Sequence, residues 1–178
     1  RTGYRGWTYT QKTAPVSLTG KIRYKEKNYS ISSPFCLAIT DWTTGYMRRK
    51  TFWSRAIAAA VLPGGRTLGL NLSWGINETG FTENAFWIDR EMTKVDTVCF
   101  ASDPHDPGSQ WHLTSYDGKI DLTFHPECHR YEKINILIVA SKFTHKMGQF
   151  EGRLITDNGE TVNIRACPGW VEDGWGKW

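Results

Sequence analysis

The feature that most constrains the fold of this chain is a set of tight-turn sequences between segments of alternating polarity. Asp117-Gly118 lies within SYDGKIDLTF, and Asn158-Gly159 lies within GRLITDNGETVNI. Both pairs accept the positive φ angles that two-residue hairpin turns need, and their flanks alternate between apolar and polar residues as half-buried strands do. A third turn is predicted at Pro63-Gly64-Gly65. Such turns predict antiparallel β-structure.

Between these turns the sequence predicts about eleven short strands. They cover residues 17–24, 28–33, 35–41, 67–74, 84–88, 94–100, 111–116, 119–125, 134–140, 143–156 and 160–166. One short helix is predicted at residues 51–62, because an alanine-rich segment there precedes the helix-ending pair Pro63-Gly64; a continuous buried strand is the alternative. The expected fold is therefore all-β, an antiparallel barrel or sandwich with at most one short helix.

The bulk properties favour a single soluble domain. The chain has 178 residues, of which 39% are apolar and 22% charged, so residues 1–178 are expected to form one β-barrel-like domain. No apolar run approaches the roughly 20 residues that cross a bilayer, and the net charge of +4 comes without a nucleic-acid-binding motif. The four cysteines are widely spaced and form no CxxC. We therefore expect free thiols, a cytoplasmic location, no membrane span and no nucleic-acid partner.

The segment FCLAITDWTTGY places a carboxyl group on a predicted strand face. Leu37, Ile39 and Asp41 share one face of this strand. If the two apolar side chains point into the core, Asp41 does too, and burial would raise its pKa and make it a candidate general acid. In the alternative interpretation Asp41 ends the strand and caps the following turn through backbone N–H groups.

A second mixture of apolar and polar residues occurs in LGLNLSWGINETGFTENAFW. One strand face carries Leu68, Leu70, Leu72 and Trp74. Asn71 and Ser73 lie on the other face, where they line a barrel interior or are solvated, depending on which way the leucines point. Glu83 and Asn84 follow on opposite faces of a regular strand, so they share one cavity only if a bulge intervenes.

The aromatic content is high, with 9 Trp, 8 Phe and 7 Tyr. Tryptophan suits large cores as well as stacking platforms for flat ligands. We interpret the mixed segments as the aromatic wall and polar fringe of a pocket; a structural network of side-chain hydrogen bonds is the alternative. The candidate ligand-binding residues are Trp42, Tyr46, Trp53, Asn71, Ser73, Trp74, Asn84 and Trp87. The candidate acids are Asp41 and Glu83.

The histidines and cysteines give little indication of a metal site. His125, Cys128 and His129 lie close together in HPECH, but their spacing matches no zinc class, and Pro126 is expected to end the element. The chain also lacks the nucleophile elbow, the phosphate-binding loop, the dinucleotide fingerprint and the HExxH motif. Neither a metal nor a cofactor is expected.

A series of motifs, taken in order, resembles a known family. They are YTQK (9–12), DWTTGYMRRKTFW (41–53), GLNLSWG (69–75), TEN (82–84), LTFHPECHR (122–130), GQFEGRL (148–154), DNG (157–159) and GWVEDGWGKW (169–178). The chain resembles the C-terminal half of the uncharacterised family called domain of unknown function twenty-eight-oh-four. The resemblance implies a longer protein, in which an N-terminal half precedes Arg1 and is a partner of this half.

That family is in turn similar to the lipocalin-like superfamily of hydroxyneurosporene synthase, a carotenoid hydratase, which also includes cofactor-free cyclases of fungal polyketide pathways. This similarity implies two lipocalin-like antiparallel barrels in the whole protein, with a ligand space at or between them. A histidine expected in the terminal motif is absent here, because the chain reads Gly174-Trp175. A role assigned to that histidine does not carry over.

Three functions fit these observations. The preferred one is binding of an apolar or lipid-like small molecule in an aromatic-lined β-barrel pocket. The second is a cofactor-independent hydratase, isomerase or cyclase, in which Asp41 or Glu83 protonates an alkene or carbonyl and tryptophan faces stabilise the cation. The third is a carbohydrate-binding or interaction module with exposed tryptophans.

Overall fold

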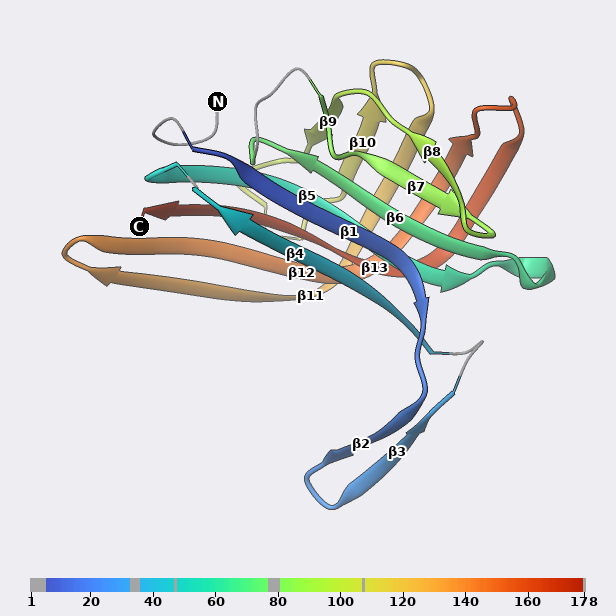
Figure 1. Ribbon diagram of the computed structural model, residues 1–178, viewed down its shortest axis with the longest axis horizontal. Helices are drawn as coiled ribbons and strands as arrows, with labels where there is room; N and C mark the ends of the chain where they lie inside the picture. The colour runs from blue at the N-terminus through green and yellow to red at the C-terminus, as the bar shows by residue number, and fades with distance from the viewer. Residues whose placement is uncertain (1–5, 33–35, 47, 77–80, 107, 178) are drawn as a thin grey trace.

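The computed structural model describes residues 6–32, 36–46, 48–76, 81–106 and 108–177, and within these ranges it is all-β (Figure 1). The elements are β1 (Thr8–Ser17), β2 (Gly20–Tyr24), β3 (Lys27–Ile31), β4 (Leu37–Gly45), β5 (Lys50–Val61), the 3-10 turn η2 (Pro63–Gly65), β6 (Thr67–Trp74), β7 (Ala85–Ile88), β8 (Glu91–Lys94), β9 (Val98–Ala101), β10 (Trp111–Ser115), β11 (Ile120–Ile136), β12 (Val139–Ile155) and β13 (Thr161–Lys177). The predicted all-β class is confirmed.

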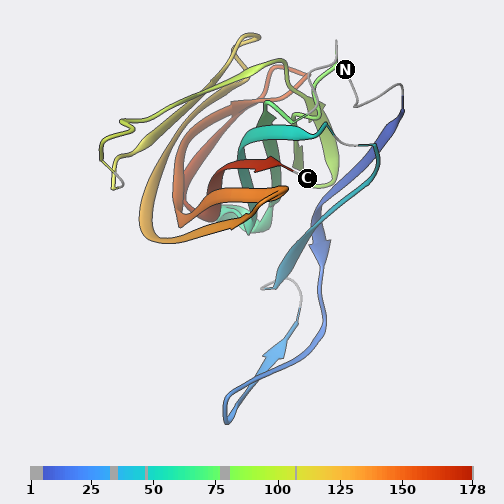
Figure 2. The same cartoon turned by 90° about the vertical axis from the view of Figure 1, so that its left-hand side faces the viewer.

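Nine strands form one antiparallel sheet in the order β8-β7-β6-β5-β13-β12-β11-β10-β9. The sheet curls into a half-barrel, as Figure 2 shows. Its concave face encloses the hydrophobic core, whose largest fully buried side chains include Phe86, Phe124, Phe150, Leu70 and Leu113. The two end strands, β8 and β9, do not pair with each other in the part of the chain that the structure describes.

The predicted helix at residues 51–62 is wrong, because this segment forms strand β5 in the middle of the sheet. β5 pairs with β6 on one side and with β13 on the other. Ala56, Ala58 and Ala60 lie beside Leu72, Leu70 and Leu68 of β6 and are buried with them in the core. The small side chains suit a strand that is covered on both faces, and this tertiary packing overrides the helix propensity of alanine.

Three predicted turns are confirmed. Asp117-Gly118 joins β10 to β11, Asn158-Gly159 joins β12 to β13, and Pro63–Gly65 joins β5 to β6. Gly118 and Gly159 have φ angles of 72° and 84°, which glycine adopts without the steric cost that a Cβ imposes.

Several predicted strand bounds in the second half are wrong; β13, for example, runs to Lys177 and does not end at residue 166. Pro126 does not end a strand: β11 continues through it, with a register shift between Pro126 and Cys128. The segment 134–140 is not one strand but the tip of the β11–β12 hairpin, whose turn is Leu137-Ile138. This turn carries no glycine, asparagine or aspartate, so turn chemistry could not reveal it.

A second, two-stranded sheet of β1 and β4 covers the outer face of the half-barrel near β5 and β6 (Figure 1). The two layers touch closely at Gly69, where a Cβ would lie 2.4 Å from the carbonyl carbon of Ala14. The small β2–β3 hairpin extends away from the body of the molecule. The structure shows no helix in the described ranges that could span a membrane, and all four cysteines are unpaired, as expected.

Candidate functional site

The polar residues predicted in the first half of the chain converge on the outer face of the large sheet, beneath the β1–β4 layer. Arg55 of β5 is at the centre. Its guanidinium group binds the carboxylate of Asp41 from β4 and donates a 2.9 Å hydrogen bond from Nη2 to Oδ1 of Asn71. Nη1 also lies 4.0 Å from Oε1 of Glu172 on β13. The buried cation is thereby compensated by carboxylates from two elements.

The same network continues from β6 into the segment before β7. Asn71 Nδ2 donates to the backbone oxygen of Glu83 over 3.1 Å, and Ser73 Oγ donates to Glu83 Oε1 over 2.8 Å. Asn84 accepts a 2.6 Å hydrogen bond from the backbone N–H of Ser73 and donates one of 3.1 Å to the backbone oxygen of Asp96. Asn71, Ser73 and Asn84 are all buried. These contacts have the form of the structural network that was the alternative to a pocket fringe.

Asp41 does not have the raised pKa that the general-acid hypothesis required. Partial burial would raise the pKa of this carboxyl group, but the hydrogen bond from Lys12 and the charge of Arg55 outweigh burial and hold the pKa below its ordinary value of 3.8. The Lys12 ammonium group also lies 3.7 Å from Glu83 Oε1. Asp41 is therefore an ionised partner of two cations.

The predicted aromatic residues do not share one cavity. Trp42 and Tyr46 are exposed on the β1–β4 layer. Trp53 and Trp87 are half-buried on the outer face of the large sheet, because they alternate with core-facing neighbours along β5 and β7. Trp74 alone of the five lies on the concave side, where its ring centroid is 5.3 Å from that of Phe52.

A large cleft lies on the concave face, where β5, β11, β12 and β13 run beyond the packed core. Its volume is about 830 Å³. The aromatic residues that line it are Phe52, Phe100, Trp111, Tyr131 and Trp175. The polar and charged residues are Ser54, Ser102, Asp103, Asp106, Lys142, Thr144, Lys146 and Asp173. The cleft thus combines an aromatic wall with polar and charged side chains that can orient a ligand.

Lys146 is the most informative residue of this cleft. Its side chain is only 8% exposed, and Nζ lies over the indole of Trp111, 5.4 Å from the ring centroid. Desolvation lowers the pKa of Lys146, and the charges of Asp106 and Asp173 oppose this effect. The Lys146 ammonium group makes no hydrogen bond or ion pair within the described part of the chain. A lysine in this state retains its capacity to donate hydrogen bonds.

Two further groups in the cleft bear on binding. Ser54 Oγ donates a 2.9 Å hydrogen bond to Asp173 Oδ1 across the β5–β13 pair, which fixes the orientation of that carboxylate. Trp111 Nε1 is buried and has no hydrogen-bond partner among the described residues. A buried donor without a partner is uncommon in folded proteins.

Sequence reasoning missed this cleft, although a signal for it was present. Along β12 the concave face continues from the core residue Phe150 through Gly148 to Lys146, Thr144 and Lys142. A strand face that changes from apolar to polar while staying on the inner side of a sheet indicates a lined opening rather than solid core.

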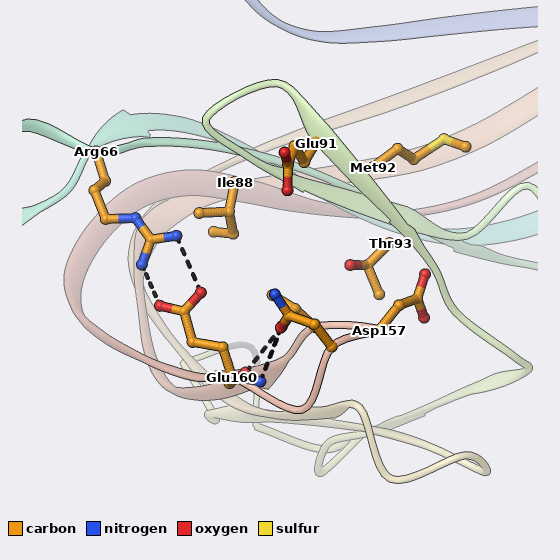
Figure 3. Close-up of a pocket in the computed structure, with 9 residues that line it drawn as sticks. Arg66, Ile88, Glu91, Met92, Thr93, Asp157 and Glu160 are labelled. Atoms are coloured by element: carbon orange, nitrogen blue, oxygen red, sulfur yellow. Dashed lines mark hydrogen bonds and ion pairs between the residues drawn. The ribbon is translucent and has the colours of Figure 1, made fainter.

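A smaller hollow of about 150 Å³ lies at the other end of β5 and β13 (Figure 3). Arg66 and Glu160 face each other across it and form an ion pair, and Arg66 Nε also lies 2.8 Å from Asp89 Oδ2. The hydrogen bond from Arg66 lowers the pKa of Glu160. These charged groups pair with one another and link the β5–β6 turn to the β12–β13 turn. We therefore interpret the hollow as structural and not as a ligand site.

The described residues contain no group of three or more His, Cys, Asp or Glu side chains that could hold a metal ion. Within HPECH, His125 contacts Gln110 and Glu151 over 3.0 and 2.8 Å, while Cys128 is exposed.

Fold and site together define an all-β half-barrel protein with an open, aromatic-walled cleft on its concave face. The chain belongs to the family Domain of unknown function (DUF2804), whose sequence model matches residues 3–178. The family part of the predicted resemblance is thereby confirmed. No curated protein and no solved structure matches the chain.

Proposed function

We propose that the concave cleft binds an apolar or lipid-like small molecule, with the polar end of the molecule at Lys146. The observation that carries this proposal is the position of Lys146: a desolvated ammonium group without a hydrogen-bond partner in the described chain, set among aromatic walls. A ligand oxygen would accept the hydrogen bond that Lys146 has available.

The size and composition of the cleft support the same proposal. Its volume of about 830 Å³ falls within the roughly 300–1,000 Å³ typical of small-molecule sites. Trp111 and Trp175 offer large apolar surfaces, and the hydrogen bond between Ser54 and Asp173 fixes two of the polar groups. The aromatic wall suits the apolar body of a ligand, and the polar side chains suit a polar end.

The proposal also includes the two-barrel organisation and the cellular location of the whole protein. A curled antiparallel sheet with a ligand cleft on its concave side shares its curvature with lipocalin-like barrels, although those barrels close fully. We propose that the chain is the C-terminal half of a longer two-barrel protein, that the N-terminal half is its partner, and that the protein is cytoplasmic. The four unpaired cysteines support the last point.

Binding can be tested with a fluorescent long-chain fatty acid and the matching fatty alcohol. Trp175→Ala removes part of the wall and is expected to weaken both probes. Lys146→Met keeps the apolar stem but removes the charged donor, so it is expected to weaken the acid by about tenfold more than the alcohol. Trp42→Ala, on the outer layer, is the matched control and should leave both affinities unchanged.

Two results would contradict the proposal. The first is that neither probe binds the wild-type protein. The second is that Trp42→Ala weakens binding as much as Trp175→Ala does. Equal loss of acid and alcohol in Lys146→Met would leave the apolar cleft but remove the assignment of the polar end to Lys146.

No observation favours the enzymatic alternative in which Asp41 or Glu83 acts as a general acid. An acid that protonates an alkene must be protonated and must face the substrate. Asp41 is held ionised by Lys12 and Arg55, and both Asp41 and Glu83 lie on the outer face, with the sheet between them and the cleft. As candidate acids, Asp41 and Glu83 remain an untested hypothesis, and their test is turnover in Asp41→Asn.

The carbohydrate-binding alternative needs exposed aromatic rings that form a flat platform. The β1–β4 layer exposes Trp7, Tyr9, Trp42 and Tyr46. However, the Trp7–Tyr46 and Tyr9–Trp42 pairs have interplanar angles of 88° and 63°. Rings at these angles present edges as well as faces, so they do not form the flat platform that a carbohydrate ring needs.

A further inference from the structure

The tip of the β11–β12 hairpin is the most exposed apolar segment in the described chain. Leu137, Ile138 and Ile136 are 92%, 70% and 66% exposed, and Ile134 and Val139 are also exposed. The hairpin projects beyond the core at the end of the molecule where the cleft lies (Figure 1). Contiguous apolar groups of this kind mark interaction sites on soluble proteins.

The turn at this tip breaks the local rules for a hairpin. Ile136 pairs with Val139, so Leu137 and Ile138 are the two turn residues, and Leu137 has a φ of 45°. Asparagine, aspartate and glycine tolerate such angles far better than leucine does. The other tight hairpin turns from β7 onward use Asp89-Arg90, Asp117-Gly118 and Asn158-Gly159, and each of them contains an Asp or Asn. A costly, fully exposed Leu-Ile pair indicates that the apolar tip serves contact rather than folding.

Basic residues surround the base of this tip. Lys133 and Lys142 face each other across the hairpin, and Lys177 of β13 is paired with Lys50 of β5 at the same end of the sheet. Arg48 and Arg49 directly precede β5. Glu132 is the acid nearest the tip along β11, and it is neutralised by Arg130. An apolar tip within a basic collar is complementary to an anionic bilayer surface.

Amphipathic aromatic residues lie at the same end. Trp7 and Tyr46 stand where β1 begins and β4 ends, are 60% and 58% exposed, and contact each other edge to face. Trp175, near the end of β13, is partly exposed. Tryptophan and tyrosine favour the boundary between headgroups and acyl chains.

We propose that this end of the sheet docks on an anionic lipid bilayer, with residues 136–139 in the membrane interface. Tyr131, Lys142 and Thr144 of the same two strands line the cleft. The docked protein therefore presents its cleft beside the lipid. This proposal goes beyond ligand binding in the cleft. It depends on the apolar tip at residues 136–139, which does not line the cleft, so either proposal can fail without the other.

The test is co-sedimentation with vesicles of phosphatidylcholine alone and with vesicles that contain roughly one part phosphatidylserine in four. The wild-type protein is expected to bind the anionic vesicles, and added salt should weaken this binding. The double variant Leu137→Asn, Ile138→Gly introduces favourable turn chemistry and removes the apolar tip. It should lower vesicle partitioning by roughly tenfold or more while its thermal unfolding temperature stays the same or rises.

Met92→Gln is the control, because Met92 is an exposed apolar residue on the edge strand β8. It should bind vesicles as the wild type does. The proposal is overturned if the double variant retains vesicle binding. It is equally overturned if light scattering shows a wild-type dimer that the double variant converts to a monomer, because the tip then binds a second copy. Fatty-acid binding by the double variant reports on the cleft separately.

Discussion

The two faces of the large sheet both carry buried cations, Arg55 on the outer face and Lys146 on the concave face, but they place them in different surroundings. On the outer face, Arg55 lies beneath the β1–β4 layer and is bound by Asp41 and Asn71. On the concave face, the cleft leaves Lys146 desolvated and without a hydrogen bond in the described chain. A covering layer turns polar side chains into cross-links, whereas an uncovered concave face leaves them available for a ligand.

The largest expected effect comes from breaking the outer network at its centre. Arg55→Ala leaves Asn71 Oδ1 without its donor and Asp41 with Lys12 as its one remaining cation in the described chain, so it is expected to lower the free energy of unfolding by about 3–5 kcal/mol. Urea denaturation measures this loss. Arg153→Ala removes an exposed ion pair with Asp121 and should cost less than about 1 kcal/mol. Equal losses in the two variants would show that the network does not stabilise the fold.

A somewhat smaller effect is expected from separating the two layers. Gly69→Val places a side chain against the backbone of Ala14, so the β1–β4 layer must move outward. We expect a loss of about 2–3 kcal/mol and faster hydrogen exchange in β1 and β4. Gly108→Ala, in a loop, is the matched control. If β1 and β4 exchange as slowly as in the wild type, the close contact at Gly69 is not what holds the layer.

Asp41→Asn tests the outer network through pH. The folded-state pKa of Asp41 lies below 3.8, so its ionised form stabilises the fold above that pH, and this contribution is lost as the pH falls through the folded pKa. The variant should be less stable than the wild type by about 1–2 kcal/mol near neutral pH. The difference should shrink below about pH 4. Unfolding free energies across this range measure it, and a difference that grows on acidification would contradict the ion-pair assignment.

The smallest expected effect on stability is at the cleft. Lys146→Met removes a desolvated cation that has no ion-pair partner in the described chain, so the unfolding free energy should change by less than about 1 kcal/mol, or rise. Chemical denaturation of Lys146→Met and Arg55→Ala under the same conditions compares the stability contributed by the two buried cations directly. A loss as large as that of Arg55→Ala would make Lys146 a structural residue.

The sequence predicted the fold where local chemistry and tertiary structure agree. The Asp-Gly and Asn-Gly turns were found because only a few residues tolerate their φ angles, and the alternating leucines gave β6 its bounds, Thr67–Trp74. The prediction failed at β5, because burial on both faces of this strand favours small alanine side chains over the helix that alanine otherwise forms. It also failed at Leu137-Ile138, because this turn carries residues that turns rarely contain. Both failures lie where long-range contacts or an exposed apolar tip override local propensity.

The sequence indicated that polar residues of the outer face lie together, but it did not indicate the cleft. Asn71, Ser73, Glu83 and Asn84 were expected to act together, and the structure does bring them together with Asp41. Periodicity could not show that β1 and β4 cover them, because β1 was not predicted and the side of a sheet that faces solvent is a long-range property. The cleft residues of β11, β12 and β13 lie in the C-terminal third of the chain, far in sequence from the predicted site residues, so no local pattern joined the two sets.

The half-barrel has a seam between β8 and β9, where no backbone ladder joins the two ends of the sheet. Contacts from the segment before β7 hold the chain that crosses it: Thr82 Oγ1 binds the Val95 oxygen, and Asn84 Nδ2 binds the Asp96 oxygen. A closed barrel has its circumference set by strand number and shear. Here that constraint is absent between β8 and β9, and these side-chain bonds, with the backbone bond from Val95 N to the Asn84 oxygen, link the two ends of the sheet instead.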